Sequence, residues 1–477
     1  MKNLLNKYKQ MGKEAKAGLW FIICNFLQKG IAFVTIPMFT RMMSTEQYGL
    51  VTLFNTWSSL LLIFATLNIS GSVYSRGLIE YDQKKFTSIT QAVSTMFSVS
   101  LLLIIVIFKD FFVKVTGLNF HILLLMCIYF IFSVGLNLWS VKERFNYRYK
   151  KLVIITLLNT ALSTIFAIIA VYFADNKGEV KIIVSTLVML LTTLPFYIKN
   201  YVDGKKFFDK KIWKYVLCFA LPLVPHYLSY LILGQSDKIM INYFCGKTDV
   251  ALYGVAYSLE SILLVFIDAI TATLTPWRYK NLKEENYEKI NDVSLKILVA
   301  IAGLVIIVNL FAPEILYIFA SPEYKSAVWV IPPIMLSAFY IFLYSFYSSV
   351  EFYFLETKFM MIASSISAIV NIILNYIFIS KFGYIVCAYT TVICYILYCI
   401  CHYIYMNFVC KKNIGNKKIY NNKKILCIAT ICSIITEASL LLYKNFILRY
   451  LIIAILFVIV ILLKNKIISM FNEVKKK

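Results

Sequence analysis

The sequence predicts an all-α membrane protein that crosses the bilayer about fourteen times. Of the 477 residues, 60% are hydrophobic and 15% are charged, and the mean hydropathy is +0.76. A soluble domain has about 25% charged residues, and a disordered chain is far more polar. The net charge of +24 fits a soluble nucleic-acid-binding protein, but the hydrophobicity excludes one. Long apolar runs joined by basic segments are typical of polytopic membrane proteins.

The first apolar run, 17–40, follows five lysines and could be mistaken for a signal peptide. It is longer than the apolar core of a signal peptide, about 7–15 residues, and no small-residue cleavage site follows it. We therefore expect an uncleaved first helix. The other predicted helices fall near 50–74, 86–108, 119–140, 152–173, 182–198, 214–236, 252–276, 297–319, 327–350, 359–379, 384–407, 425–442 and 447–463.

The basic residues predict the orientation of these helices. With the N-terminus in the cytoplasm, 36 of the 48 Lys and Arg residues fall in cytoplasmic segments and only 10 on the opposite side. Cytoplasmic loops of membrane proteins are enriched in basic residues. Both termini are therefore expected in the cytoplasm. An odd number of helices would place later basic segments on the wrong side, which favours fourteen.

The connections and the cysteines exclude several functional classes. No predicted outer connection exceeds about a dozen residues, and the sequence has no Walker A motif, so neither a catalytic domain nor ATP-driven transport is expected. We predict no enzymatic activity and no catalytic residues. The eleven cysteines are scattered, without a CxxC motif or a Cys/His cluster. No metal site, disulfide framework or cofactor is expected.

An internal repeat divides the predicted helices. Tyr48-Gly49 opens the second helix after a polar turn, and Tyr253-Gly254 opens the eighth helix 205 residues later. Six helices separate the two motifs, so both copies have the same orientation, as in parallel repeats. The predicted organisation is an N-lobe (1–198, helices 1–6), a cytoplasmic linker (199–213), a C-lobe (214–410, helices 7–12), and two further helices with a basic tail (411–477).

Four short motifs carry a family signal. They are Ile36-Pro37 to Arg41 with Ser44 and Tyr48-Gly49; Ala220-Leu221-Pro222-Leu223-Val224-Pro225; Ser236-Asp237-Lys238 with Gly246 and Tyr253-Gly254; and Ala312-Pro313-Glu314-Ile315 with Ser321-Pro322-Glu323-Tyr324. In this order, and with fourteen helices, the sequence resembles the polysaccharide (lipid-linked oligosaccharide, O-antigen type) flippases. These belong to the multidrug/oligosaccharidyl-lipid/polysaccharide exporter superfamily. Lys238 stands where an Arg is common in the family.

The resemblance implies a fold and a function. It implies two six-helix lobes in a pseudo-twofold V, with helices 1, 2, 7 and 8 lining a central cavity. The implied substrate is an undecaprenyl-diphosphate-linked oligosaccharide, moved from the cytoplasmic to the outer leaflet by alternating access for capsule, O-antigen or a similar surface polysaccharide. The implied location is the bacterial cytoplasmic (inner) membrane. Membrane lipids, a coupling proton or sodium ion and a polysaccharide polymerase are the implied partners.

Two alternative functions stay open. One is a cation-coupled multidrug exporter of the same superfamily, for which acidic groups in the cavity would suit cationic drugs. The other is a membrane-embedded enzyme that modifies or polymerises polysaccharide. The sequence lacks the catalytic His/Asp or His/Glu cluster on an aqueous loop that such an enzyme needs.

Ionisable residues inside the predicted helices are the candidate site residues, because burying a charge in hydrocarbon is costly. Lys29 lies near the middle of helix 1. Its ammonium could bind the diphosphate of a lipid carrier or an acidic sugar. Alternatively, it could form a neutralising pair with Glu260 or Asp268 of helix 8. These two carboxylates lie about 80° apart around the helix, and either could carry a coupling proton.

Helix 7 carries further candidates. Asp237 and Lys238 are adjacent, so they point in different directions and should contact different partners. Arg41, at the end of helix 1, is a candidate partner of Asp237 in a gate; Arg41 and Lys238 are also candidate substrate ligands. Pro222 and Pro225 could make helix 7 a bending element or a static kink.

Two asparagines of helix 11 are expected to serve packing. Asn371 and Asn375 are four residues apart, which places them on one face of the helix. This spacing predicts hydrogen bonds to a neighbouring helix.

Overall fold

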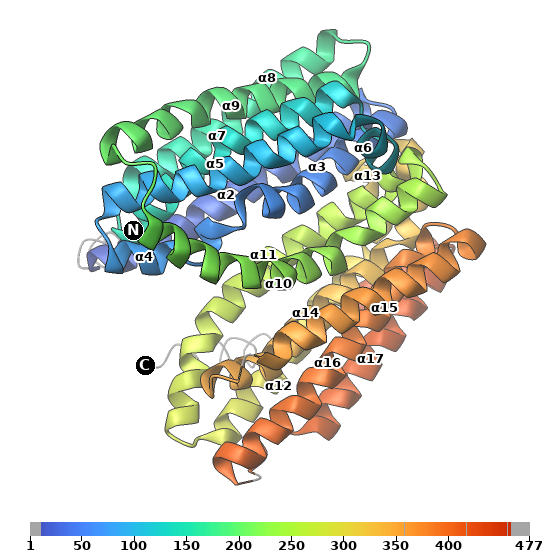
Figure 1. Cartoon of the computed structure of the whole chain (residues 1–477). Coiled ribbons are helices and arrows are strands. Elements are labelled where there is room, and N and C mark those ends of the chain that lie inside the picture. The colour runs from blue at the N-terminus through green and yellow to red at the C-terminus, as the bar shows by residue number, and fades with distance from the viewer. Residues whose placement is uncertain (1–10, 357, 416, 456, 459–477) are drawn as a thin grey trace. The chain divides into compact units, whose positions relative to one another are not determined.

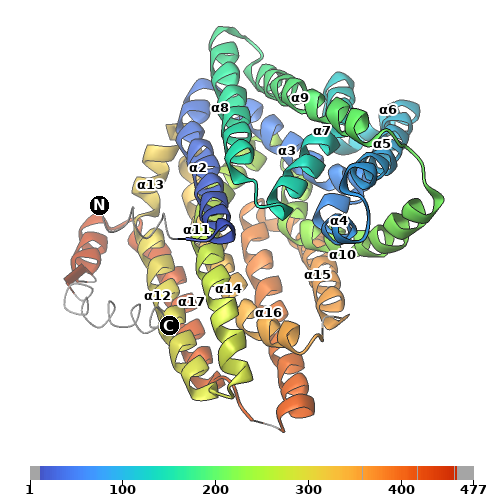
Figure 2. The ribbon, with the colours of Figure 1, turned by 90° about the vertical axis from the view of Figure 1, so that its left-hand side faces the viewer.

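The computed structural model describes residues 11–356, 358–415, 417–455 and 457–458. Within these ranges the chain forms helices and connections and no β-strand, which confirms the predicted all-α class (Figures 1 and 2). The chain packs as two units, Met1–Ala251 and Leu252–Lys477. The lobes predicted from the repeat, 1–198 and 214–410, divide the chain differently and stay a prediction.

The helices of unit 1 follow the predicted runs closely. They are α2 (Lys13–Met42), α3 (Thr45–Thr66), η1 (Ile69–Gly71), α4 (Tyr74–Glu80), α5 (Gln83–Ile107), α6 (Lys109–Thr116), α7 (Phe120–Phe145), α8 (Tyr149–Phe173), α9 (Lys177–Gly204) and α10 (Lys210–Phe244). The second predicted helix ends earlier than expected, because Leu67 and Asn68 adopt positive φ angles of 50° and 46°. Such left-handed residues stop an α-helix.

Unit 2 begins within α11. Its elements are α11 (Lys247–Lys283), α12 (Tyr287–Leu310), α13 (Ala312–Phe319), η2 (Pro322–Trp329), α14 (Ile331–Tyr353), α15 (Lys358–Phe382), α16 (Ile385–Ile414), α17 (Asn422–Leu442) and a short apolar helix, Phe446–Ile455. The ninth predicted helix is divided into α12 and α13. Pro313 lies in the first turn of α13. Backbone N–H groups in the first turn of a helix have no intrahelical partner, so a proline, which lacks this group, is favourable there.

The number of spanning helices agrees with the prediction as far as the description extends. Twelve described helices are long and apolar enough to cross a membrane, and α10 is a thirteenth as a bent span. The fourteenth predicted helix, 447–463, overlaps Phe446–Ile455 and otherwise lies outside the described residues. The cytoplasmic location of the termini stays a prediction.

A close helix–helix contact holds the centre of unit 1. α7 packs between α5 and α9, and the three run side by side (Figure 1). A Cβ atom on Gly135 of α7 would lie 2.4 Å from the backbone of Tyr197 on α9, so only glycine permits this approach. Asn200 donates to the Gly135 carbonyl (3.0 Å) and to Gln91 Oε1 on α5 (2.9 Å). These bonds satisfy polar groups that would otherwise be buried without partners.

The remaining helices of unit 1 surround this centre. α8 packs on α9, α2 packs on α8, and α10 packs on α3 and α5. The first turns of α10 close an aromatic cluster, in which Phe86 stacks between Tyr74 and Tyr81 and Val216 is fully buried. Gly49 of the repeated motif allows another tight contact, because a Cβ atom there would lie 1.9 Å from the Lys247 carbonyl oxygen.

Unit 2 is built around α14. This helix packs against α12, α16 and α17, and α15 packs on the far side of α16. The expected hydrogen bonds of α15 to a neighbouring helix are confirmed. Asn371 donates to Thr391 Oγ1 of α16 (3.1 Å), and Thr390 of α16 donates to Asn375. Buried amide and hydroxyl groups of this kind hold membrane helices together.

Candidate functional site

Lys29 lies on α2, and of the twelve described spans this helix has the lowest share of buried residues in its most apolar window, 6%. α2 is apolar on all sides, and only Ala17, Cys24, Phe39 and Thr40 are buried. Gln28 Nε2 donates to Thr160 Oγ1 of α8 (3.1 Å), which directs one side of α2 towards its neighbour. Lys29 follows about 100° further around the helix and is exposed. Among the described residues of unit 1, no carboxylate lies within ion-pair distance of its ammonium.

Arg41 ends the same helix. It is exposed, and its Nη1 donates to the Pro37 carbonyl at 3.0 Å. Thr40 Oγ1 shares this acceptor at 3.3 Å. These two bonds fold the side chains of Arg41 and Thr40 back along the last turns of α2, where a cation interacts favourably with the helix dipole. The predicted pairing of Arg41 with Asp237 stays a prediction.

Asp237 and Lys238 are both buried on α10, with relative exposures of 0% and 9%. Lys238 Nζ donates to Gln235 Oε1 of the same helix at 2.9 Å. Both side chains are thus buried, whereas Lys29 and Arg41 are exposed. Adjacent residues of a helix point in different directions, and contact of Asp237 and Lys238 with different partners stays a prediction.

The proline region of α10 contains a bend. Pro222 and Pro225 are exposed within the helix, and the axis changes direction by 51° between Lys210–Ser229 and Leu231–Phe244. Ser229 Oγ donates to the Pro225 carbonyl at 2.8 Å. A hydroxyl that bonds four residues back bends a helix, so Ser229 adds to the effect of the prolines. A gating role for Pro222 and Pro225 stays a prediction.

The two predicted carboxylates of α11 lie in unit 2 and differ in environment. Glu260 is buried, with 2% relative exposure, whereas Asp268 is exposed. This difference follows from their positions about 80° apart around the helix. Their pairing with Lys29 and their role in ion coupling stay predictions.

Unit 2 contains a buried pair that the predicted spans missed. Glu351 of α14 and His402 of α16 are both fully buried, and His402 Nδ1 lies 2.9 Å from each Glu351 carboxylate oxygen. Tyr344 stacks on the imidazole, and Tyr398 meets it edge-on. The predicted span ends at residue 350, one residue before Glu351, and His402 lies in the predicted span 384–407, where apolar residues surround it in the sequence.

A second missed group is Arg278, which lies beyond the predicted span of α11. Its guanidinium is buried on α14: it donates to Ser349 Oγ and to the Ser345 carbonyl (3.3 Å), and it covers the ring of Phe346 at 4.9 Å. An arginine with these contacts fastens two helices of unit 2 together. Its Nη1 bonds indicate a structural role, and its buried Nε has no hydrogen-bond partner among the described residues.

The residues that the structure describes contain no cluster of three or more His, Cys, Asp or Glu side chains able to hold a metal ion. The charged groups offer other chemistry: an exposed cation on α2, an exposed cation at its end, and buried ionisable groups on α10 and α11. An exposed ammonium within an apolar helix suits a negatively charged ligand or water. Such groups can bind and guide a charged molecule without altering its covalent bonds.

Comparison with known proteins decides the family. A family model described as "Polysaccharide biosynthesis protein" matches residues 15–281, more than half of the chain. The chain belongs to this family. A second model, MatE, matches residues 222–377. The resemblance to polysaccharide flippases of the multidrug/oligosaccharidyl-lipid/polysaccharide superfamily is thereby confirmed. Family and fold indicate a transporter or flippase rather than an enzyme.

Individual relatives agree with this assignment. Over 281 residues the chain is 24% identical to Lsg locus putative protein 1 of Haemophilus influenzae, covering 57% of this chain and 68% of the relative. The fold is similar to that of the lipid II flippase MurJ in an inward closed conformation, with a TM-score of 0.70, 18% identity and coverage of 95% of this chain and 100% of the other. An inward-facing multidrug resistance transporter of the MATE family gives a TM-score of 0.58 at 17% identity, with 82% and 96% covered.

Proposed function

We propose that this protein moves an undecaprenyl-diphosphate-linked oligosaccharide from the cytoplasmic to the outer leaflet of the bacterial cytoplasmic membrane by alternating access. The product would supply capsule, O-antigen or a similar surface polysaccharide. The family assignment supports a lipid-linked saccharide as cargo. The fold similarity to a lipid II flippase supports the same chemical class, a polyprenyl diphosphate that carries sugars.

The exposed ammonium of Lys29 gives the strongest support to this proposal. An exposed ammonium in the middle of an apolar spanning helix costs several kcal/mol against hydrocarbon, on the order of 2.5–3.5 kcal/mol on insertion scales. A transient anionic ligand offsets this cost whenever it is bound. The diphosphate of a lipid carrier supplies such an anion, and its polyprenyl tail is apolar like the surrounding hydrocarbon. Arg41 extends the positive charge towards the end of the same helix.

A multidrug exporter is the second candidate, and a separate observation favours it. The MatE family model covers α10 from Pro222 through most of α15. This region contains the carboxylates Asp237, Glu260 and Asp268, which would suit a cationic drug and a coupling cation. In either function, a proton or sodium gradient could drive the cycle through Glu260 or Asp268. A polysaccharide polymerase would be the partner that consumes the flipped product.

The test is reconstitution of the whole chain in proteoliposomes with a fluorescent undecaprenyl-diphosphate oligosaccharide. Flipping is measured as the fraction of label that a membrane-impermeant reductant quenches with time. We expect protein-dependent flipping that unlabelled lipid-linked oligosaccharide inhibits and that cationic dyes do not. Lys29→Ala should lower the rate about tenfold or more, which corresponds to about 1.4 kcal/mol or more.

Lys109→Ala is the matched control, because Lys109 is an exposed lysine of unit 1 at the start of α6, outside the spanning helices. It should flip at the wild-type rate. Uptake of cationic dyes driven by an ion gradient, without flipping of the lipid, would reject the flippase and establish the exporter. Normal flipping by Lys29→Ala would remove Lys29 from the proposal.

A further inference from the structure

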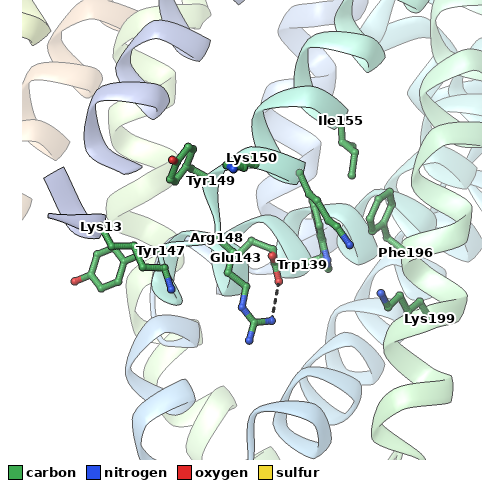
Figure 3. A pocket seen from close by; sticks show the side chains of 11 residues that line it. Lys13, Trp139, Glu143, Tyr147, Arg148, Tyr149, Lys150, Ile155, Phe196 and Lys199 are labelled. Atoms are coloured by element: carbon green, nitrogen blue, oxygen red, sulfur yellow. Dashed lines mark ion pairs between the residues drawn. The ribbon is translucent and has the colours of Figure 1, made fainter. Parts of the chain in front are cut away.

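One end of unit 1 contains a cavity that the proposed transport does not use. It lies where α2 begins, α7 ends and α8 begins, with the last turns of α9 closing one side (Figure 3). Its volume is about 680 Å³, within the range of about 300–1,000 Å³ that small ligands occupy. A single phosphate ion would fill only a small part of it, so the cavity has room for a larger headgroup.

The cavity is strongly basic. Five of the residues that line it are cationic: Lys13, Arg148, Lys150, Lys151 and Lys199. Glu143 is the one acidic residue in the lining. Its carboxylate lies 3.8 Å from Arg148 Nη1, a contact that Figure 3 marks with a dashed line. Four lysines therefore exceed the acidic charge available in the lining, and an anionic ligand would balance them.

The lining is also preorganised. Tyr147 adopts a positive φ of 54°, and the Arg148 N–H donates to the Glu143 carbonyl at 2.8 Å, so the α7–α8 connection reverses tightly. This turn brings Lys150 and Lys151 of α8 back towards the end of α7. The side chain of Asn146 donates to Gln83 Oε1 at 3.0 Å and ties the same turn to α5. The cations are thus carried on helix ends that are fixed to the unit.

Aromatic rings form the apolar wall of the cavity. Trp139 is nearly fully buried and lies against Phe196 of α9, with ring centroids 4.5 Å apart (Figure 3). Tyr149 stacks on Trp20 of α2 at 6.4 Å. Aromatic residues at the ends of spanning helices lie at the level of the lipid headgroups. The cavity therefore lies at the depth of the headgroups, with an apolar side and a basic side.

We propose that this cavity binds the phosphate headgroup of an anionic membrane lipid. Basic pockets between transmembrane helices on the cytoplasmic side are suited to such headgroups, because anionic lipids concentrate there. The predicted orientation of the helices places this end of unit 1 on the cytoplasmic side. The site is separate from Lys29, Arg41 and Lys238, and it requires neither transport nor a particular cargo.

The chain provides a matched pair of variants for the test. Lys150 and Lys151 lie in the first turn of α8 and line the cavity, whereas Lys210 and Lys211 lie in the first turn of α10, are equally exposed and do not line it. The double variants Lys150→Gln/Lys151→Gln and Lys210→Gln/Lys211→Gln therefore remove the same charge from the same kind of helix position. The full chain, in a neutral detergent, is titrated with phosphatidylglycerol, and bound lipid is counted by native mass spectrometry.

We expect the Lys150→Gln/Lys151→Gln variant to bind phosphatidylglycerol about tenfold more weakly, and the control pair to differ from wild type by less than about twofold. Lys150→Arg/Lys151→Arg should retain binding. Its unfolding midpoint and that of the glutamine variant establish that both proteins are folded. Equal weakening in both glutamine pairs would mean diffuse surface attraction and would overturn the proposal.

Two further ligands identify the source of the phosphate. Binding of an undecaprenyl diphosphate that needs Lys150 and Lys151, without binding of phosphatidylglycerol, would retain a lipid-phosphate site and assign it to the carrier. Binding of inorganic phosphate alone, with neither lipid retained, would overturn the proposal of a lipid site. The flipping assay is read independently, so failure of the transport proposal leaves these results unaffected.

Discussion

α2 and α14 are both apolar spanning helices with ionisable residues, but they are used in opposite ways. In the most apolar 18-residue window of α14, 83% of the residues are buried, against 6% in α2. Glu351 of α14 meets His402 inside unit 2. Lys29 of α2 is exposed, and the described part of unit 1 gives it no ion-pair partner. Glu351 of α14 therefore contributes to packing inside unit 2, whereas Lys29 of α2 is exposed to its surroundings.

The difference shows how the environment separates structural charges from functional ones. A charge that protein groups satisfy contributes to the fold, and its removal leaves a buried partner unsatisfied. A charge that protein groups do not satisfy contributes little to the fold and keeps its capacity for a ligand. Substitutions at four positions that differ in burial test this distinction.

The largest effect is expected at the buried pair. His402→Ala leaves the Glu351 carboxylate in unit 2 without its imidazole, and the loss of a buried partner costs about 3–5 kcal/mol. The free energy of unfolding is measured by denaturant titration in mixed micelles. The double variant Glu351→Leu/His402→Leu should recover most of this loss, because apolar replacement removes both buried polar groups. A His402→Ala protein as stable as wild type would contradict the structural role of the pair.

The second effect is at Lys29 and should separate stability from transport. Lys29→Met replaces the ammonium by an apolar group of similar length and removes no ion pair of the described part of unit 1, so the unfolding free energy should not fall by more than about 0.5 kcal/mol. Flipping should nevertheless fall about tenfold. The two measurements are made on the same preparation. A loss of stability as large as that of His402→Ala would place Lys29 in the same class as the buried pair.

The third effect concerns how α2 is joined to α3. Ser44 caps α3: its hydroxyl accepts from the Gln47 N–H, and the Gln47 side chain accepts from the Ser44 N–H, both at 3.3 Å. Ser44→Ala should cost about 1 kcal/mol of unfolding free energy. The control is Ser59→Ala. The Ser59 hydroxyl donates to the Asn55 carbonyl within α3, so its removal should have a smaller effect. Equal losses would show that the cap does not stabilise the α2–α3 corner.

The smallest effect is expected at a surface ion pair of unit 2. Lys417 Nζ lies 2.6 Å from Glu285, and both side chains are more than half exposed. The hydrogen bond and charge of Glu285 raise the pKa of Lys417 above its ordinary value of 10.5. Any stabilisation is thus fully present below pH 10.5 and is lost as the pH rises through the higher folded-state pKa.

Lys417→Met should therefore lower the unfolding midpoint far less than His402→Ala, because exposed pairs contribute little. The difference from wild type should stay constant between pH 7 and pH 9. Unfolding midpoints at several pH values measure it. A difference that disappears between pH 7 and pH 9 would contradict the raised pKa.

The spans and the class of the protein could be predicted from the sequence, because each depends on local hydropathy. The bonds of Asn371 and Asn375 could also be predicted, since two amides on one face of an apolar helix need a neighbour. The division of the ninth predicted helix was missed. Apolar residues continue through Phe311 on both sides of the break, and only Pro313 indicated a new start.

The buried charges of unit 2 were missed for a different reason. Glu351 and Arg278 lie one or two residues beyond apolar windows, where a charge is ordinarily solvated. Their burial arises from partners on other helices: His402 lies 51 residues from Glu351, and Ser349 lies 71 residues from Arg278. Hydropathy contains no information on such pairings. The cavity near Lys150 could not be predicted for a similar reason. In the sequence, its lysines indicate only on which side of the membrane the connection lies.

The loose packing of α2 has a consequence for the membrane in which the protein works. The helix has 30 residues, and its apolar run, 17–40, is about 36 Å long, whereas the hydrocarbon core is about 30 Å thick. A helix longer than the core tilts or thickens the bilayer around it, and neighbouring helices normally fix that tilt. α2 has few such neighbours in unit 1. We therefore expect hydrophobic mismatch with the surrounding lipid to influence the depth of Lys29, and the rate of flipping to vary with bilayer thickness.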